Sequence, residues 1–138
     1  MYYIVYRETM ENKITQLRKG ILELAILGSL SQGRRYGYSL VRSISGREDV
    51  ELTEGTIYPI LNRLSKEGLL RSEWVESSQG PPRKYYTLTP SGEETYRVLD
   101  GEFRKLAEMV ANACEAAAVD VADPEKGALA VKKETHDG

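Results

Sequence analysis

The sequence has little of the chemistry on which most enzymes and metal sites depend. It contains one cysteine, Cys114, and one histidine, His136, among 138 residues. A single cysteine excludes an intrachain disulfide framework and a zinc site built on cysteines. A single histidine, two residues from the C-terminus, argues against histidine-dependent catalysis and against a multi-histidine metal site. We therefore expect no enzymatic activity, no metal and no cofactor.

Long apolar runs are also missing. No stretch approaches the roughly 18 apolar residues of a membrane span. The first nine residues lack the basic segment, the long apolar segment and the cleavage site of a secretory signal. The composition, 41% hydrophobic and 29% charged, is typical of a globular domain. These features predict one small cytoplasmic protein, of a size that often gains stability by forming oligomers.

Charge is divided unevenly along the chain, although the formal net charge is only −2. Residues 10–90 carry 12 Lys and Arg against 9 Asp and Glu, a net charge of +3. Residues 91–138 carry 6 against 11, a net charge of −5. The acidic excess lies at the C-terminal end of the chain, where it can face away from a polyanion. The negative total therefore does not exclude a nucleic-acid partner.

The apolar spacing predicts three helices, two strands and a final long helix. We expect helices near residues 12–31 and 37–45, and a third that starts after Thr53 and ends before Gly68. Strands over residues 70–76 and 84–89 form a hairpin around a Gly-Pro-Pro turn, with Trp74 packed at its base. Residues 1–11 are expected to form an N-terminal arm that lacks order, and residues 119–138 a disordered acidic tail.

The final helix, over residues 91–118, has a narrow apolar stripe. Its members alternate spacings of three and four, which is the a/d pattern of a helix that pairs with another helix. They are Tyr96, Leu99, Phe103, Leu106, Val110, Ala113 and Ala117. We expect Leu99, Leu106 and Val110 to form the seam of a homodimer.

Three helices followed by a hairpin predict a mainly α fold with a small β-hairpin, namely a winged helix-turn-helix domain over residues 12–90. Its third helix would enter a major groove and its hairpin would be the wing, since Asn and Arg pair with base edges while Lys and Tyr reach phosphates. The helix N-terminus would attract a phosphate. The candidate DNA contacts are Thr53, Thr56, Tyr58, Asn62, Arg63, Lys66, Arg83 and Lys84. A protein-interaction module of the same shape would have the same polar face, so residues and spacing leave both functions open.

Several sequence blocks resemble the PadR family of bacterial transcriptional regulators. They are TEGTIYPILNRL at 53–64, EGLL at 67–70 and RKYYTLT at 83–89, with Gly80 and Gly92, and upstream GILELAIL at 20–27 and YGY at 36–38. The resemblance covers residues 17–110. The chain departs from the family pattern at Tyr36, where the family often has His.

The resemblance implies a winged-helix homodimer, usually a repressor, that binds palindromic double-stranded DNA. It also implies dimerisation through the C-terminal and N-terminal helices. Some members bind planar aromatic effectors at the dimer interface, which would assign Tyr96 and Phe103 to such a pocket. Met10 would open a family-like chain, so residues 1–9 would be either the result of a start assigned too far upstream or a disordered arm. The alternative is a winged-helix protein-interaction module that does not bind DNA.

Overall fold

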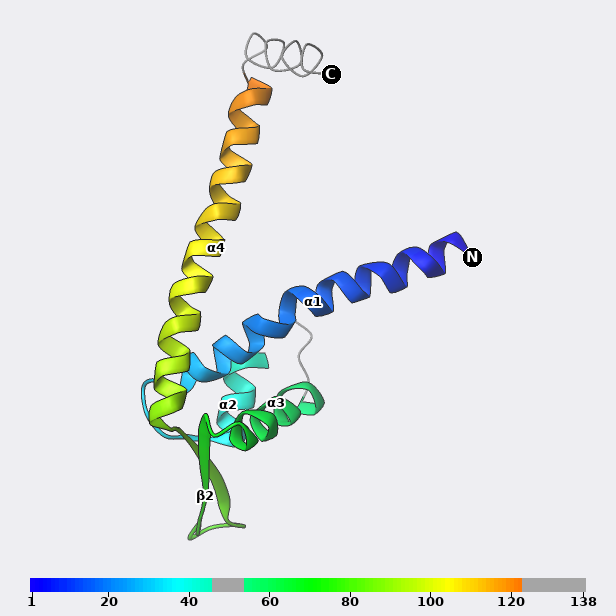
Figure 1. Ribbon diagram of the computed structural model, residues 1–138. Coiled ribbons are helices and arrows are strands. Elements are labelled where there is room, and N and C mark those ends of the chain that lie inside the picture. Colours follow the sequence, from blue (N-terminus) through cyan, green and yellow to red (C-terminus); the bar gives the residue numbers. More distant parts are fainter. Residues whose placement is uncertain (46–53, 123–138) are drawn as a thin grey trace. The chain divides into compact units, whose positions relative to one another are not determined.

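The structure, a computed structural model, describes residues 1–45 and 54–122, with side chains as far as residue 118. The chain divides into two compact units, one ending at Leu99 and the other starting at Asp100. The elements in order are α1 (Tyr2–Leu30), β1 (Arg35–Tyr36), α2 (Gly37–Ser45), α3 (Glu54–Lys66), β2 (Leu70–Val75), β3 (Arg83–Leu88) and α4 (Pro90–Ala122) (Figure 1). The fold is therefore mainly helical with a small antiparallel sheet, as the apolar spacing predicted.

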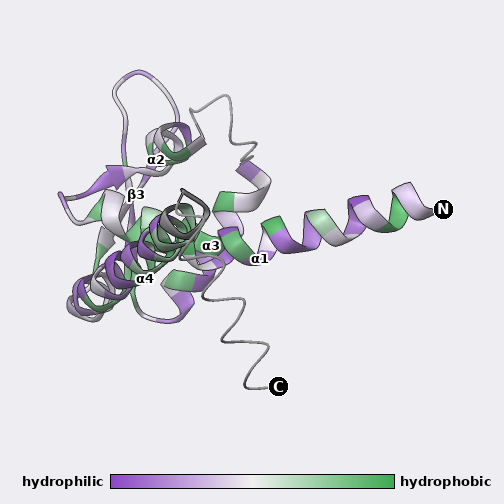
Figure 2. Cartoon of the chain, turned by 90° about the horizontal axis from the view of Figure 1, so that it is seen from above, coloured by the Kyte–Doolittle hydropathy of each residue, from purple (hydrophilic) through white to green (hydrophobic). Residues whose placement is uncertain are grey.

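Helix α1 starts at Tyr2, ten residues earlier than predicted. The segment expected to be a disordered arm is therefore helical, because nothing in residues 1–11 breaks a helix and each turn adds backbone hydrogen bonds to the preceding one. Apolar residues recur along α1 up to its N-terminal turns (Figure 2), yet the side chains of this end are exposed. The C-terminal half is different, since Ile26 and Leu27 are fully buried.

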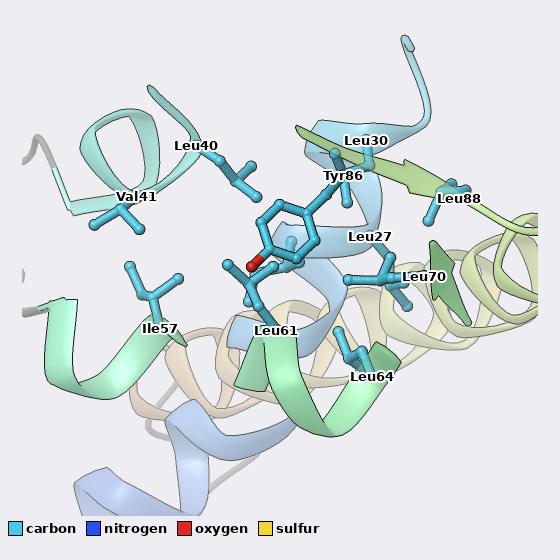
Figure 3. Packing of buried hydrophobic residues seen from close by; sticks show 11 residues of the cluster. Leu27, Leu30, Leu40, Val41, Ile57, Leu61, Leu64, Leu70, Tyr86 and Leu88 are labelled. Atoms are coloured by element: carbon cyan, nitrogen blue, oxygen red, sulfur yellow. The ribbon is translucent and has the colours of Figure 1, made fainter. Parts of the chain in front are cut away.

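The hydrophobic core lies where the C-terminal half of α1 meets α2, α3 and the sheet (Figure 1). One face of α3, made by Ile57, Leu61 and Leu64, has no exposed area at all. The ring of Tyr86 from β3 points into the same cluster (Figure 3). The spacing of three and four in α3 thus corresponds to a buried face, as predicted.

The sheet has three antiparallel strands in the order β1-β3-β2. The hairpin of β2 and β3 is the predicted wing, and it extends away from α1 and α2 (Figure 1). Strand β1 was not predicted, because two residues are too short to show an alternation. Tyr86 is buried and Tyr85 lies on the opposite face, where it pairs with Tyr36 of β1. The alternation of a β-strand therefore separates the two tyrosines as expected.

A compact junction connects the end of α3 to the start of α4. Gly68 has a φ of 77°, and the N–H of Leu69 donates to the carbonyl of Leu64 at 3.0 Å, which ends α3 in a Schellman motif. The Thr89 hydroxyl donates to the Gly68 carbonyl at 2.6 Å and accepts from the N–H of Gly92 at 3.1 Å. Thr89 therefore caps α4 and ties it to the end of α3.

Helix α4 ends at Ala122, four residues later than predicted. Residues 119–122, which were assigned to the acidic tail, are therefore helical. The rest of that tail and the N-cap Thr53 lie outside the described residues. Within the described ranges, no helix has the length and apolar character needed to span a membrane.

Candidate nucleic-acid interface

The centre of the outer face of α3 carries two of the predicted DNA contacts. Asn62 and Lys66 are exposed, and they lie on the side of the helix opposite the buried Ile57, Leu61 and Leu64. Asn62 has the amide geometry that pairs with an adenine edge, and Lys66 supplies a point charge for a phosphate. This part of the predicted surface is open to a ligand.

One flank of this face turns toward α1. The Arg63 guanidinium donates to the carboxylate of Glu23 with Nη2 and Oε2 3.3 Å apart, and the Arg63 side chain remains 45% exposed. Thr56 lies on the same flank, where it lines a cavity shared with α1. The Arg63 guanidinium is therefore partly exposed, and the Glu23 carboxylate offsets part of its positive charge.

The other flank turns toward α2 and β1. Tyr58 is half-buried and packs against the core cluster, so it is less open than the prediction of an outer-face residue implied. Burial raises the pKa of the Tyr58 hydroxyl above its usual value, and Glu54, Tyr36 and Tyr38 raise the pKa further. Tyr58 therefore stays protonated well above neutral pH and can donate a hydrogen bond to a phosphate.

The two basic residues of the wing are held over aromatic rings. The Arg83 guanidinium lies 5.0 Å from the centre of the Tyr36 ring. The Lys84 ammonium lies 5.6 Å from the ring centres of both Trp74 and Tyr86. Cation–π contacts of this kind orient a charge without neutralising it. Trp74 itself is 68% exposed, so the expectation that it packs at the base of the wing is wrong, because it lies on β2 beyond the part of the sheet that the helices cover.

A second set of basic and aromatic groups was missed by the sequence reasoning. Arg34, just before β1, donates to Glu73 of β2 at 2.6 Å and lies 4.6 Å from the centre of the Tyr85 ring. The rings of Tyr36 and Tyr85 are themselves 5.8 Å apart. Only the pairing of β1 with β3 brings these groups together, and a two-residue strand leaves no signal in the sequence.

The predicted seam of α4 divides between the two units. Leu99 and Tyr96 pack against the core of the first unit, and the Tyr96 ring lies against Gly28 of α1. In the second unit Phe103, Leu106 and Val110 are 40%, 48% and 57% exposed. Two roles stay predictions: that of Leu99, Leu106 and Val110 in a dimer, and that of Tyr96 and Phe103 in an effector pocket.

Comparison with known proteins points to one family of transcriptional regulators. The profile of the "Transcriptional regulator PadR-like family" matches residues 26–98. A transcriptional regulator of Mycobacterium tuberculosis, Rv3488, is 32% identical over 77 residues, which cover 56% of this chain and 70% of that protein.

Solved structures agree in both fold and sequence. A PadR-like transcription factor from Bacteroides fragilis is 40% identical with a TM-score of 0.61, and the match covers 74% of this chain and 98% of that one. A PadR family transcriptional regulator from Eggerthella lenta is 31% identical with a TM-score of 0.64, covering 81% and 97%. The matched residues include α2, α3 and the wing. The chain therefore belongs to the PadR-like family, whose members are DNA-binding transcriptional regulators and not enzymes.

Proposed function

We propose that this protein is a cytoplasmic homodimeric repressor that binds a palindromic DNA site. The observation that carries the proposal is the exposed polar centre of α3, with Asn62 and Lys66, on a helix whose other face is fully buried. A helix fixed in this way presents its polar side chains to a major groove at a constant angle. Two such helices in a dimer would read half-sites about 34 Å apart, one turn of the duplex.

Exposed apolar side chains on both long helices support a dimer. On α1 they follow a spacing of four, three and four: Met10, Ile14, Leu17 and Ile21 are 39%, 40%, 70% and 42% exposed. The second unit carries Phe103, Leu106 and Val110 on α4. Stripes of this spacing are stabilised when a second helix covers them, because exposed apolar area is costly in water. A second copy of the chain would cover them by symmetry.

The proposal is tested first by the binding of double-stranded DNA. Fluorescence anisotropy of the purified protein against its own upstream intergenic DNA, with a scrambled duplex as control, should show a preference of about 10³-fold or more. The slope of affinity against salt concentration then estimates the number of phosphates that are bound. Equal, weak binding to both duplexes would direct the search to another operator through a selection on genome fragments.

A variant without the interface cations distinguishes DNA binding from protein interaction. Replacement of Arg63, Lys66, Arg83 and Lys84 by Ala should abolish DNA binding and leave the dimer intact. A matched variant that replaces Arg7, Lys13, Arg97 and Lys105 removes the same charge from exposed positions outside α3 and the wing. If both variants bind DNA equally well, α3 and the wing are not the DNA-binding surface and the alternative, a protein-interaction module, is favoured.

The dimer has its own test. Leu106→Lys places a charge in the predicted seam and should produce monomers in sedimentation equilibrium, with much weaker operator binding. Ala111→Lys adds the same charge at an exposed position of α4 outside the seam and should leave the dimer unchanged. Dimers of equal stability for both variants would exclude the α4 seam.

A further inference from the structure

We propose that Trp74 of the wing binds the sugar-phosphate backbone of DNA, with its indole ring against a deoxyribose and the Lys84 ammonium on the adjoining phosphate. The contact rests on the proposed function, because it adds a residue to the same DNA-binding surface. It would strengthen DNA binding without reading the base sequence, since every nucleotide carries the same sugar.

Trp74 is the only tryptophan of the chain, and 68% of its surface is exposed. It lies directly opposite Lys84 in the ladder between β2 and β3, so both side chains lie on the same face of the hairpin. The Lys84 ammonium is 5.6 Å from the centre of the indole ring. A cation–π contact of this kind orients both groups, and the exposed part of the ring stays open to a ligand.

A row of side chains connects Trp74 to α3. The Lys84 ammonium is also 5.6 Å from the centre of the Tyr86 ring, which lies two residues along β3 and therefore on the same face. Tyr86 belongs to the core cluster against which Tyr58 of α3 packs. Trp74 thus lies on the face of the sheet that is turned toward the helices, and the row ends at a candidate DNA contact of α3.

The place of Trp74 within the hairpin favours a sugar over a base. Residues 76–82, between the end of β2 and the start of β3, lie beyond it toward the tip of the wing. A side chain that wedges between two base steps has to protrude into the groove, whereas Trp74 lies on one face of the hairpin.

The chemistry of the pair also fits the backbone of DNA. If the Lys84 ammonium binds a phosphate, the deoxyribose attached to that phosphate brings apolar surface next to the indole. The indole N–H can in addition donate a hydrogen bond to a phosphate oxygen. An apolar ring beside a cation therefore matches a backbone that alternates sugars with phosphates.

The first test uses intrinsic fluorescence, because tryptophan emission comes from Trp74 alone. The full-length protein is titrated with its own upstream intergenic DNA. The emission should shift to shorter wavelength, and quenching by acrylamide should fall about threefold, as expected when an aromatic ring leaves water at an interface. Lys66→Ala should lower the affinity for DNA but give the same protection of Trp74 once DNA is saturating.

Substitutions then separate the indole from the cation. Trp74→Ala should weaken binding to the upstream DNA and to a scrambled duplex by the same factor, about tenfold, without a change in the salt slope, because an apolar contact releases no counterions. Trp74→Phe keeps a ring and should recover most of this loss. Lys84→Ala should lower the salt slope by about one. Val98→Ala removes apolar surface from a 60% exposed position of α4 and is the matched control, so it should change neither quantity.

Three results would overturn the proposal. Unchanged acrylamide quenching, while anisotropy reports bound DNA, would place the indole outside the contact and leave the proposed function standing. A loss for Trp74→Ala that is confined to the upstream DNA would assign this residue to a base and not to a sugar. A protein that binds neither duplex, with unchanged Trp74 emission, would contradict both this contact and the proposed function.

Discussion

Arg63 of α3 and Glu23 of α1 form an ion pair, with 3.3 Å between Nη2 and Oε2, across 40 residues of sequence. The Arg63 side chain is 45% exposed and the Glu23 side chain 21% exposed, so the pair lies at the edge of the proposed DNA-binding surface and not in the core. An exposed pair of this kind contributes little to stability. Its main consequence is that a predicted DNA contact is partly neutralised before DNA arrives.

We therefore expect Glu23→Gln to strengthen DNA binding, because the full charge of Arg63 becomes available to a phosphate. The gain should be about three- to tenfold at low salt and smaller at high salt, since exposed charges are screened. Fluorescence anisotropy over a salt series measures it. Glu11→Gln removes a carboxylate that pairs with Arg7 at 3.4 Å on the same helix, so it is the matched control. Equal gains in both variants would mean that only net charge matters.

The two residues at the centre of the α3 face should have different roles. Lys66→Ala should weaken binding to all duplexes alike and lower the salt slope by about one, as expected for a phosphate contact. Asn62→Ala should cost about 1–3 kcal/mol on the operator and much less on a scrambled duplex, as expected for a base contact. Competition anisotropy with both duplexes separates the two effects. A uniform loss for Asn62→Ala would assign that residue to the backbone.

A side chain at position 92, near the start of α4, should lower the stability of the fold. A Cβ added to Gly92 would lie 2.1 Å from the carbonyl oxygen of Leu69, so the junction formed by Thr89 must shift. We expect Gly92→Ala to lower the free energy of unfolding by about 1–3 kcal/mol, the usual cost of overpacking. Urea denaturation followed by circular dichroism measures this change.

Gly101 is the matched control for Gly92, because it lies on the same helix with nothing within 4 Å of an added Cβ. Gly101→Ala should raise the free energy of unfolding by about 0.5–1 kcal/mol, since alanine favours a helix more than glycine does. Destabilisation of similar size in both variants would show that the close approach at Leu69 is not the cause.

Alkaline pH should destabilise the fold through two tyrosines. Burial raises the pKa of Tyr86, with a further contribution from Tyr58, and burial also raises the pKa of Tyr58. In the unfolded chain both hydroxyls lose their protons near pH 10, whereas the folded protein keeps them. The free energy of unfolding should therefore be unaffected by these groups below pH 10 and fall as pH rises above it.

Absorbance at 295 nm against pH checks this ionisation directly. Tyr58→Phe should remove one late-ionising tyrosine and make the fall in stability above pH 10 shallower. A titration curve of unchanged shape in that variant would contradict the assignment. Tyr85→Phe, which changes the neighbouring residue on the opposite face of β3, is a suitable comparison.

The order and type of the main elements could be predicted from the sequence, because helices and strands impose their own periods on apolar residues. The buried face of α3 and the separation of Tyr85 from Tyr86 follow from those periods alone. Asn62 and Lys66 also could be identified in this way, since a residue opposite a buried face is exposed in most packing arrangements. The start of α1 at Tyr2 differed from prediction because a helix can continue where its side chains are not buried.

The contacts between side chains from different elements could not be predicted in this way. The pairing of Arg63 with Glu23, the cavity between α1 and α3, and the approach of Arg34 to Tyr85 each join residues far apart in sequence. Such contacts depend on the angle at which two helices cross and on the register of a two-residue strand. The period of the apolar residues predicts which side of an element is buried. The residue that each side chain contacts depends instead on how the elements pack together.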